Sequence, residues 1–319
     1  MTDPKDPPVT DMCGVYFDLE SWESYLRTFA DLSPGYLSAF ALPLARYAGI
    51  EPSRYLAALA DGPNRAVDTL LAGPGLAVSV DEHVAGLRAA GVVRQVLHGG
   101  QGRLPDGTTV NDRLVKITSE HRDTLRVWAG LDLTDVHAAI DELERCVTDL
   151  GLRGASMVHW WAGRAPDDPD CHKLYARAAE LGVPLWIHAG TNYSRNRAFD
   201  HCTWRDLDRI ASSHPDLVIV AGHGGWPWIT EAMAVLQRQP NVHLEFSAHR
   251  PKYMSRPGSG WEPMLNYGRN MVRDKIMFGS VTWVHSVPIG VLANEVRALG
   301  LGAEAEHAWL HGNAGRLLA

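Results

Sequence analysis

The sequence predicts an α/β fold in which eight parallel strands close into a (β/α)8 barrel. Eight short apolar runs alternate with segments of helical periodicity, which is typical of parallel strands joined by helices. Two of these runs, P-L-W-I-H-A-G and D-L-V-I-V-A-G-H-G-G-W, end in a histidine followed by a glycine. These histidines, His188 and His223, lie 35 residues apart. A strand, a crossover helix and the next parallel strand need about 30 residues or more, so the spacing fits one repeat.

The expected strands are short apolar runs bounded by turn residues, as in strands buried on both faces. They cover residues 9–17, 92–97, 125–131, 154–159, 185–189, 217–221, 242–246 and 276–279. Helical periodicity is expected at residues 79–90, 111–122, 135–149, 171–181, 229–237, 287–299 and 304–318. This alternation is the reason for expecting a closed parallel sheet.

The length of 319 residues fits one barrel of ordinary size, so a single domain is expected over residues 9–319. Residues 1–8 are polar and proline-rich and are expected to form a flexible tail. Residues 18–75 show helical spacing that glycine and proline cut into short pieces. We interpret this segment as a helical insertion after the first strand, covering one face of the barrel.

Composition excludes several classes of partner. The net charge of −7 comes from scattered residues, and without a basic stripe neither nucleic acid nor an anionic membrane is expected to bind. The four cysteines show no C-x-x-C spacing, and no apolar run approaches 18 residues. These features predict a soluble, cytoplasmic protein that acts on a small molecule. They leave the oligomeric state open, with a homodimer as one alternative.

Several motifs resemble the amidohydrolase-related TIM-barrel family. They include G-L-R-G-A-S-M, G-V-P-L-W-I-H-A-G, H-P-D-L-V-I-V-A-G-H-G-G-W-P-W, N-V-H-L-E-F-S-A-H-R-P-K-Y and H-G-N-A-G-R-L-L. The resemblance runs from about residue 9 to residue 318. That family includes aromatic-acid and aminocarboxymuconate-semialdehyde decarboxylases, and lactone hydrolases are close relatives. The resemblance therefore implies a barrel of the amidohydrolase type with an active site at the carboxyl ends of the strands.

The metal-ligand motifs of the family are altered here. The family's first strand ends in D-x-H-x-H, whereas this chain keeps Asp11 but has Cys13 and Val15 at the histidine positions. The eighth strand of the family reads F-G-S/T-D, and here Val281 replaces the aspartate. The resemblance places His188 at a metal-ligand position and His223 at an acid–base or metal-proximal position. Three of the four usual ligands are thus missing.

This loss predicts an active site without metal or other cofactor, because a catalytic zinc normally has three protein ligands. Residual zinc held by Cys13, His188 and His223 is the alternative. In the metal-free interpretation, His223 and His188 are the catalytic residues, since neutral imidazole suits proton transfer near pH 7. His223 would be the general acid or base, and His188 would polarise a carbonyl or hold the leaving group. Their structural alternative is a pair of hydrogen-bonded remnants without function.

The pocket wall is predicted from residues that follow strand ends. Tryptophans cluster there, and indole rings would line a dry pocket suited to a flat or aromatic ligand. An arginine at the same end could bind a carboxylate through two hydrogen bonds. The predicted substrate-binding residues are Cys13, His159, Trp161, Trp226, His249, Arg250, Ser280 and Trp283.

The leading functional hypothesis is hydrolysis of a lactone or activated amide of a small aromatic or conjugated carboxylate metabolite, by histidine-based acid–base catalysis. One alternative is a metal-free lyase of secondary metabolism, such as a decarboxylase, hydratase or cyclase in a biosynthetic pathway. Another is a pseudoenzyme that uses the old pocket only to bind a ligand. Release of carbon dioxide rather than uptake of water would separate the first two.

Overall fold

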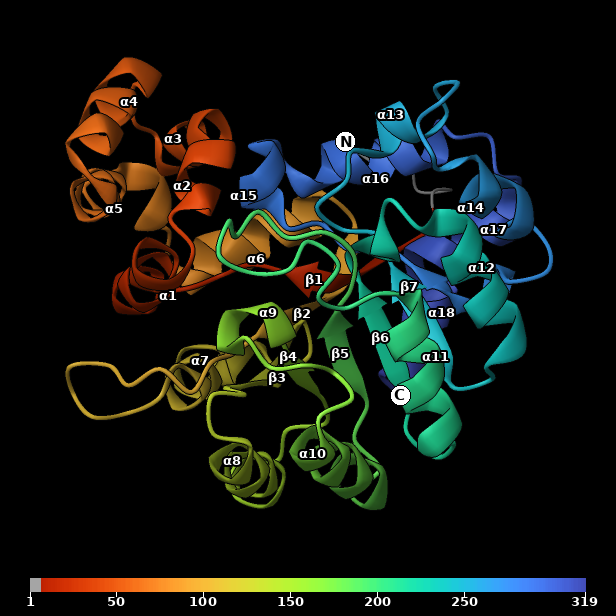
Figure 1. The fold of residues 1–319 in the computed structure, drawn as a ribbon. Helices are drawn as coiled ribbons and strands as arrows, with labels where there is room; N and C mark the ends of the chain where they lie inside the picture. Colours follow the sequence, from red (N-terminus) through yellow and green to blue (C-terminus); the bar gives the residue numbers. More distant parts are fainter. Residues whose placement is uncertain (1–6) are drawn as a thin grey trace.

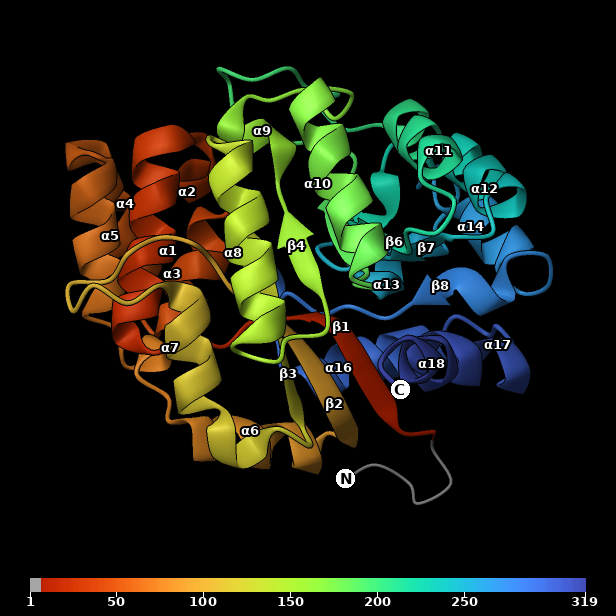
Figure 2. The same ribbon diagram turned by 90° about the horizontal axis from the view of Figure 1, so that it is seen from below.

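A computed structural model describes residues 7–319, and within them eight parallel strands form one sheet in the order β1 to β8 (Figures 1 and 2). The amide of Met12 in β1 donates to the carbonyl of Phe278, directly after β8, at 2.9 Å, which brings the two ends of the sheet together. The predicted (β/α)8 barrel is confirmed. Its strands are β1 (Val9–Gly14), β2 (Val92–His98), β3 (Leu125–Leu131), β4 (Ala155–Met157), β5 (Leu185–His188), β6 (Ile219–Gly222), β7 (Val242–Glu245) and β8 (Ile276–Met277).

The strands form because their side chains are buried on both faces, between the barrel interior and the outer helices. Every residue of β1, β4, β5 and β6 is buried. Parallel pairing then sets the register between neighbours: His188 of β5 lies opposite Gly222 of β6, the residue before His223. The two histidines therefore lie at the same end of the barrel, as their sequence spacing predicts.

Helices surround the sheet and begin at residues suited to that role. Ser79, Thr109 and Thr203 each start a helix with a reciprocal capping box, in which side chain and backbone satisfy each other's hydrogen bonds. No helix within residues 7–319 is long and apolar enough to cross a lipid bilayer. The helices after β2 are α7 (Val110–Ile117), α8 (Val136–Thr148), α9 (His159–Ala162), α10 (Pro169–Glu180), α11 (Trp204–Ser213), α12 (Ile229–Arg238), α13 (Pro251–Met254), α14 (Glu262–Tyr267), α15 (Thr282–His285), α16 (Ile289–Arg297), α17 (Ala303–His307) and α18 (Asn313–Leu317).

Six α-helices and one short 3-10 helix (Pro74–Leu76) separate β1 from β2, and the first five α-helices form a compact group on one side of the barrel, coloured red to orange in Figure 1. Apolar and aromatic residues on α1 face the barrel, including Trp22, Leu26 and Phe29, all at most 3% exposed. The group thus covers part of the barrel opening. The six helices are α1 (Leu19–Leu32), α2 (Gly35–Ala39), α3 (Ala41–Ala48), α4 (Pro52–Asp61), α5 (Pro63–Leu71) and α6 (Val80–Ala89).

The element boundaries differ from the sequence prediction by two or three residues at four strands: β1 ends at Gly14 rather than at residue 17, β6 begins at Ile219 rather than at residue 217, and β4 and β8 are also shorter. Strand β4 ends at Met157 rather than at residue 159, because His159 already begins the short helix α9. Strand β8 has two residues, and Val281, four residues after its end, adopts a left-handed backbone with φ of 37°. Most of the predicted flexible tail, residues 1–6, lies outside the described residues.

A buried aspartate connects the first and last strands. One carboxylate oxygen of Asp11 accepts hydrogen bonds from the backbone amides of Cys13 and Ser280, at 3.1 and 2.9 Å. The other accepts from the Gln95 side chain at 2.8 Å and from the Ser280 hydroxyl at 2.6 Å. Asp11 is fully buried, so water could not accept these four hydrogen bonds in place of its carboxylate. The residue joins β1, β2 and the segment after β8 at the point of barrel closure.

We expect Asp11→Ala to lower the free energy of unfolding by roughly 2–4 kcal/mol, because it leaves several buried donors without an acceptor. Urea unfolding followed by circular dichroism measures this loss. The control is Asp31→Ala, which removes an exposed aspartate near the end of α1 and should change the free energy by less than roughly 0.5 kcal/mol. Equal midpoints for the two variants would show that Asp11 does not hold the barrel closed.

Candidate active site

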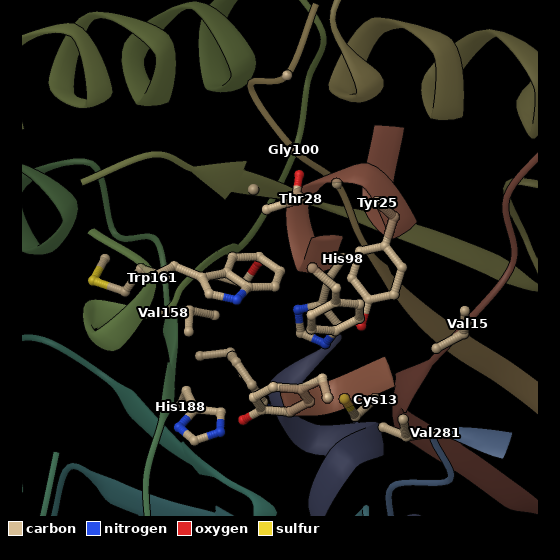
Figure 3. Close-up of a pocket in the computed structure, with 18 of the residues that line it drawn as sticks. Cys13, Val15, Tyr25, Thr28, His98, Gly100, Val158, Trp161, His188 and Val281 are labelled. Atoms are coloured by element: carbon tan, nitrogen blue, oxygen red, sulfur yellow. The ribbon is translucent and has the colours of Figure 1, made fainter. Parts of the chain in front are cut away.

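A cavity of about 390 Å³ opens at the carboxyl ends of the strands. Aromatic rings from the insertion and from the loops form its outer part, and polar side chains at strand ends form its base. In Figure 3, Trp161 and Tyr25 lie on one side of the cavity, and His188 and Cys13 on the other. The lining aromatic residues are Phe17, Tyr25, Phe29, Tyr36, Phe40, Trp160, Trp161, Trp186, Tyr193 and Trp283.

The aromatic wall is a connected set of rings from distant segments. Tyr25 and Phe29 of α1 make edge-on contacts with Trp161, with ring centroids 6.1 and 5.8 Å apart. Tyr36 of α2 stacks on Trp160 at 4.9 Å with the ring planes 5° apart. The insertion thereby contributes directly to the cavity, and its rings exclude water from a site suited to a flat apolar ligand.

Three potential metal ligands meet at the base. Cys13 belongs to β1, His223 follows β6, and Glu245 ends β7, and their ligand atoms all lie within 4.8 Å of one another. Cys13 and His223 line the cavity, while Glu245 is fully buried behind it. His223 has a left-handed backbone with φ of 63°, a conformation that costs energy in residues other than glycine and is often found at functional sites.

The carboxylate of Glu245 is held by four donors. It accepts hydrogen bonds from the Trp186 indole at 3.0 Å, the backbone amide of His223 at 2.9 Å, and the amide and hydroxyl of Ser247 at 2.7 and 2.9 Å. Burial raises the pKa of Glu245, and these hydrogen bonds oppose that rise because they favour the charged form. Ser247 also bridges to His223, with its Oγ 2.7 Å from Nδ1.

The histidines around the cavity are neutral at pH 7. Burial lowers the pKa of His98, His188 and His249 to about 4, and it lowers that of His223 well below its usual value. No lysine or arginine is among the described residues that line the cavity. A carboxylate ligand would therefore meet no permanent positive charge from these side chains.

Burial and the nearby Glu245 carboxylate raise the pKa of the Cys13 thiol well above its usual value. The thiol is therefore protonated at neutral pH unless a cation lies beside it. A divalent metal ion would reverse that preference, since a coordinated thiol loses its proton.

Six of the ten predicted site residues line one cavity. His188 and His223 are close neighbours, with ring centroids 5.0 Å apart and ring planes at 80°. The Nδ1 atom of His188 is buried and has no hydrogen-bond partner among the described residues. The six are Cys13, Trp161, His188, His223, His249 and Trp283.

The other four predicted site residues do not line this cavity. Arg250 forms a two-point ion pair with Glu295, at 2.9 and 2.5 Å, so its guanidinium is already engaged. His159 is fully buried, with its Nε2 2.8 Å from the Tyr175 hydroxyl. Trp226 packs beside His249, and the Ser280 hydroxyl is bound to Asp11. The four residues are His159, Trp226, Arg250 and Ser280.

Sequence reasoning missed both Glu245 and the aromatic residues of the insertion. Glu245 had a recognisable signal, since a charged residue inside the apolar strand of N-V-H-L-E-F must have partners in a barrel core. The aromatic residues of the insertion also had a recognisable sequence signal: Trp22, Tyr25 and Phe29 are spaced as residues on one face of a helix.

Two valines, at the positions where the sequence predicts missing metal ligands, lie on the cavity wall with Cys13. Val15 and Val281 both line the cavity, and the amide of Val281 donates to the carbonyl of Cys13 at 2.9 Å. Val281 has positive φ, which is costly for a β-branched residue. Residues 13, 15 and 281 thus all line one cavity, and the two valine side chains cannot bind metal.

A parallel barrel with a cavity at the carboxyl ends of its strands is typical of enzymes. The model of the amidohydrolase family matches residues 74–319, so the chain belongs to that family. It is an enzyme of the amidohydrolase superfamily. Helices α1 to α5 precede the matched region.

Among curated proteins, the chain is 28% identical to decarboxylase orsB of Emericella nidulans over 177 residues, which are 48% of this chain and 50% of that protein. It is 30% identical to γ-resorcylate decarboxylase of a Rhizobium species over 141 residues, 36% of this chain and 43% of that protein. The chain thus spans about half the length of the curated relatives it matches.

A solved structure with the same fold is 5-carboxyvanillate decarboxylase from Novosphingobium aromaticivorans, in complex with manganese and 4-hydroxy-3-methoxy-5-nitrobenzoic acid. It aligns with a TM-score of 0.65 and 18% identity, over 98% of this chain and 96% of that one. The manganese contradicts the sequence-based prediction of a site without a cofactor, and that prediction is wrong. It weighed Cys13, His188 and His223 as the remaining donors and left out Glu245, which β7 brings to within 4.8 Å of Cys13 and His223.

Proposed function

We propose that this enzyme decarboxylates a small aromatic carboxylic acid. The observation that carries the proposal is the aromatic-walled cavity of about 390 Å³ that ends in a group of potential metal ligands. The two curated relatives described above are decarboxylases, which favours the lyase alternative over hydrolysis of a lactone or amide. The bound compound of the Novosphingobium enzyme is an aromatic acid of the size that such a cavity accepts.

The aromatic wall would bind the ring of the substrate. Tyr25 and Phe29 of α1 and Trp161 of α9 present one connected apolar surface, and stacked or edge-on contacts with a substrate ring are favourable. Because these rings belong partly to the helical insertion, the insertion would contribute to substrate selection. The same rings exclude water, which favours proton transfer to carbon over competing hydration.

The donor group at the base fits a divalent metal ion. A thiolate, an imidazole and a carboxylate are all metal ligands, and three protein ligands are the usual number in a catalytic zinc site. Cys13, His223 and Glu245 would hold the ion, which would supply the positive charge that the lining residues lack. That charge would bind and orient the carboxylate or a neighbouring oxygen of the substrate.

Decarboxylation requires a proton at the ring carbon that carries the carboxylate. The carbon–carbon bond breaks, its electron pair stays on the ring carbon, and that carbon keeps the added proton as carbon dioxide leaves. His188 lies on the cavity wall and is free of other partners at Nδ1. His188 is neutral at pH 7, so it would first take up a proton from water or from a hydroxyl of the substrate, and its pKa of about 4 makes that protonated form a strong acid toward the ring carbon. We therefore assign proton transfer to His188 rather than to His223, whose Nδ1 is already engaged by Ser247.

The proposal is tested with γ-resorcylate and 5-carboxyvanillate, the acids that name the relatives, together with other hydroxybenzoic acids. The enzyme, loaded in parallel with zinc, cobalt or manganese, should release one carbon dioxide per molecule of phenol formed. Methyl esters of the same acids are the control, because an ester cannot lose carbon dioxide until it is hydrolysed. Methanol from the esters, or ring opening of aryl lactones, without carbon dioxide from any acid would replace the proposal with the hydrolase hypothesis.

A further inference from the structure

We infer that Cys13, His223 and Glu245 form a site for a thiophilic divalent ion such as zinc or cobalt, in preference to manganese. The inference deepens the proposed function, since it concerns the metal that the same active site would use. It also separates this chain from the Novosphingobium enzyme, whose structure contains manganese.

The chemistry of the donors carries the preference. Manganese is best bound by carboxylate, carbonyl and water oxygens, whereas a cysteine thiolate selects softer ions such as zinc. One of the three donors here is sulfur and one is an imidazole nitrogen, leaving a single carboxylate. Binding of first-row ions to such a mixed site also follows the general rise in affinity from manganese to zinc.

The scaffold holds the donors before any ion binds. The carboxylate of Glu245 is fixed by the Trp186 indole and by the backbone amide of His223. Gly279 leaves the space that this carboxylate occupies, because a Cβ at residue 279 would lie 2.2 Å from Glu245 Oε2. Cys13 is placed by the end of β1, where its carbonyl accepts the amides of Ser280 and Val281.

Ser247 gives the site a defined state without metal. Its hydroxyl donates a hydrogen bond to Glu245 at 2.9 Å and lies 2.7 Å from His223 Nδ1. Two of the three potential metal ligands therefore have a hydrogen-bond partner when no ion is bound. Metal binding would exchange these hydrogen bonds for metal–ligand bonds. Replacement of Ser247 by alanine removes that competitor while keeping all three donors in place.

The experiment is a titration of metal-stripped enzyme with cobalt(II), followed by absorption spectroscopy, with no substrate present. A bound thiolate gives an intense near-ultraviolet sulfur-to-cobalt charge-transfer band, which oxygen and nitrogen ligands alone do not produce. We expect this band to saturate at one equivalent of cobalt and to be abolished by zinc but not by equal manganese. Cys13→Ser should lose the band and bind zinc at least roughly 10-fold more weakly.

The control is Cys202→Ser, which alters a buried cysteine outside the cavity wall and should keep the band. Cys13→Asp should shift preference toward manganese, since a second carboxylate replaces sulfur. Ser247→Ala should bind cobalt with equal or greater affinity and the same band. If Cys13→Ser proves unstable, the wild-type spectrum and the Cys13→Asp selectivity still decide the matter.

A wild-type spectrum without the charge-transfer band, or a band that survives in folded Cys13→Ser, would overturn the assignment. Displacement of zinc by equimolar manganese would do the same. None of these readouts uses turnover, so failure of the metal inference is distinct from failure to release carbon dioxide. A cobalt site with the predicted band in an enzyme that decarboxylates nothing would leave the metal site in place and reject only the proposed reaction.

Discussion

His188→Ala is expected to lower kcat for decarboxylation roughly 10²–10⁴-fold, the usual contribution of a positioned acid or base. The metal content of this variant should be unchanged, because His188 is not one of the three donors that lie within 4.8 Å of each other. Substrate binding should weaken much less than turnover, since the aromatic wall is intact. Initial rates of carbon dioxide release, with metal analysis of the same sample, measure both quantities.

His223→Ala should cause a comparable loss for a different reason, because it removes a metal donor. Its metal content should fall together with its activity. Since both residues serve one reacting centre, the double variant should lose much less than the product of the single losses. His137→Ala, which removes a histidine whose side chain is 69% exposed, should keep the wild-type rate and unfolding temperature. Full turnover by folded His188→Ala would place the proton donor elsewhere on the wall.

Removal of the metal is expected to lower turnover by roughly three orders of magnitude, because charge stabilisation by a bound ion is worth several kcal/mol. Dialysis against a chelator removes the ion, and stoichiometric zinc or cobalt should restore the rate. Thermal unfolding of the stripped enzyme is measured alongside. We expect the barrel to remain folded, since Ser247 and Trp186 continue to satisfy Glu245 without metal.

Magnesium is the matched control for re-addition, because it is a divalent ion that prefers oxygen ligands and should not restore turnover. The metal role would be contradicted if the enzyme kept its full rate while elemental analysis found well under one equivalent of any transition metal. Side chains alone would then carry out the reaction. In that case His188 and His223 would carry it as an acid–base pair.

The barrel could be predicted from sequence because its determinants are local. A run of four to seven apolar residues bounded by turns is buried wherever it lies, and helices between such runs require parallel pairing. The same logic placed His188 and His223 at one end of the barrel. Their register follows from two neighbouring parallel strands, and it is realised as the pairing of His188 with Gly222.

Partners of individual side chains could not be predicted in this way. Arg250 was expected to bind a substrate carboxylate, but its guanidinium forms an ion pair with Glu295 of α16. Binding a substrate would require that ion pair to break. Ser280 was expected in the pocket wall, but its hydroxyl points to Asp11, which is 269 residues away in sequence. The first contact depends on how α16 packs against the segment after β7, and the second on how β8 meets β1, and no local sequence pattern encodes either.

The sequence by itself therefore determined the fold class and placed His188 and His223 at one end of the barrel, where the cavity opens, because apolar periodicity and strand length suffice for these. The tertiary structure decided the composition of the site. It brought Cys13, His223 and Glu245 from three strands to within 4.8 Å and laid the rings of α1 and α2 over the opening. Barrel closure makes residues distant in sequence into neighbours, and only the packed chain shows which of them meet.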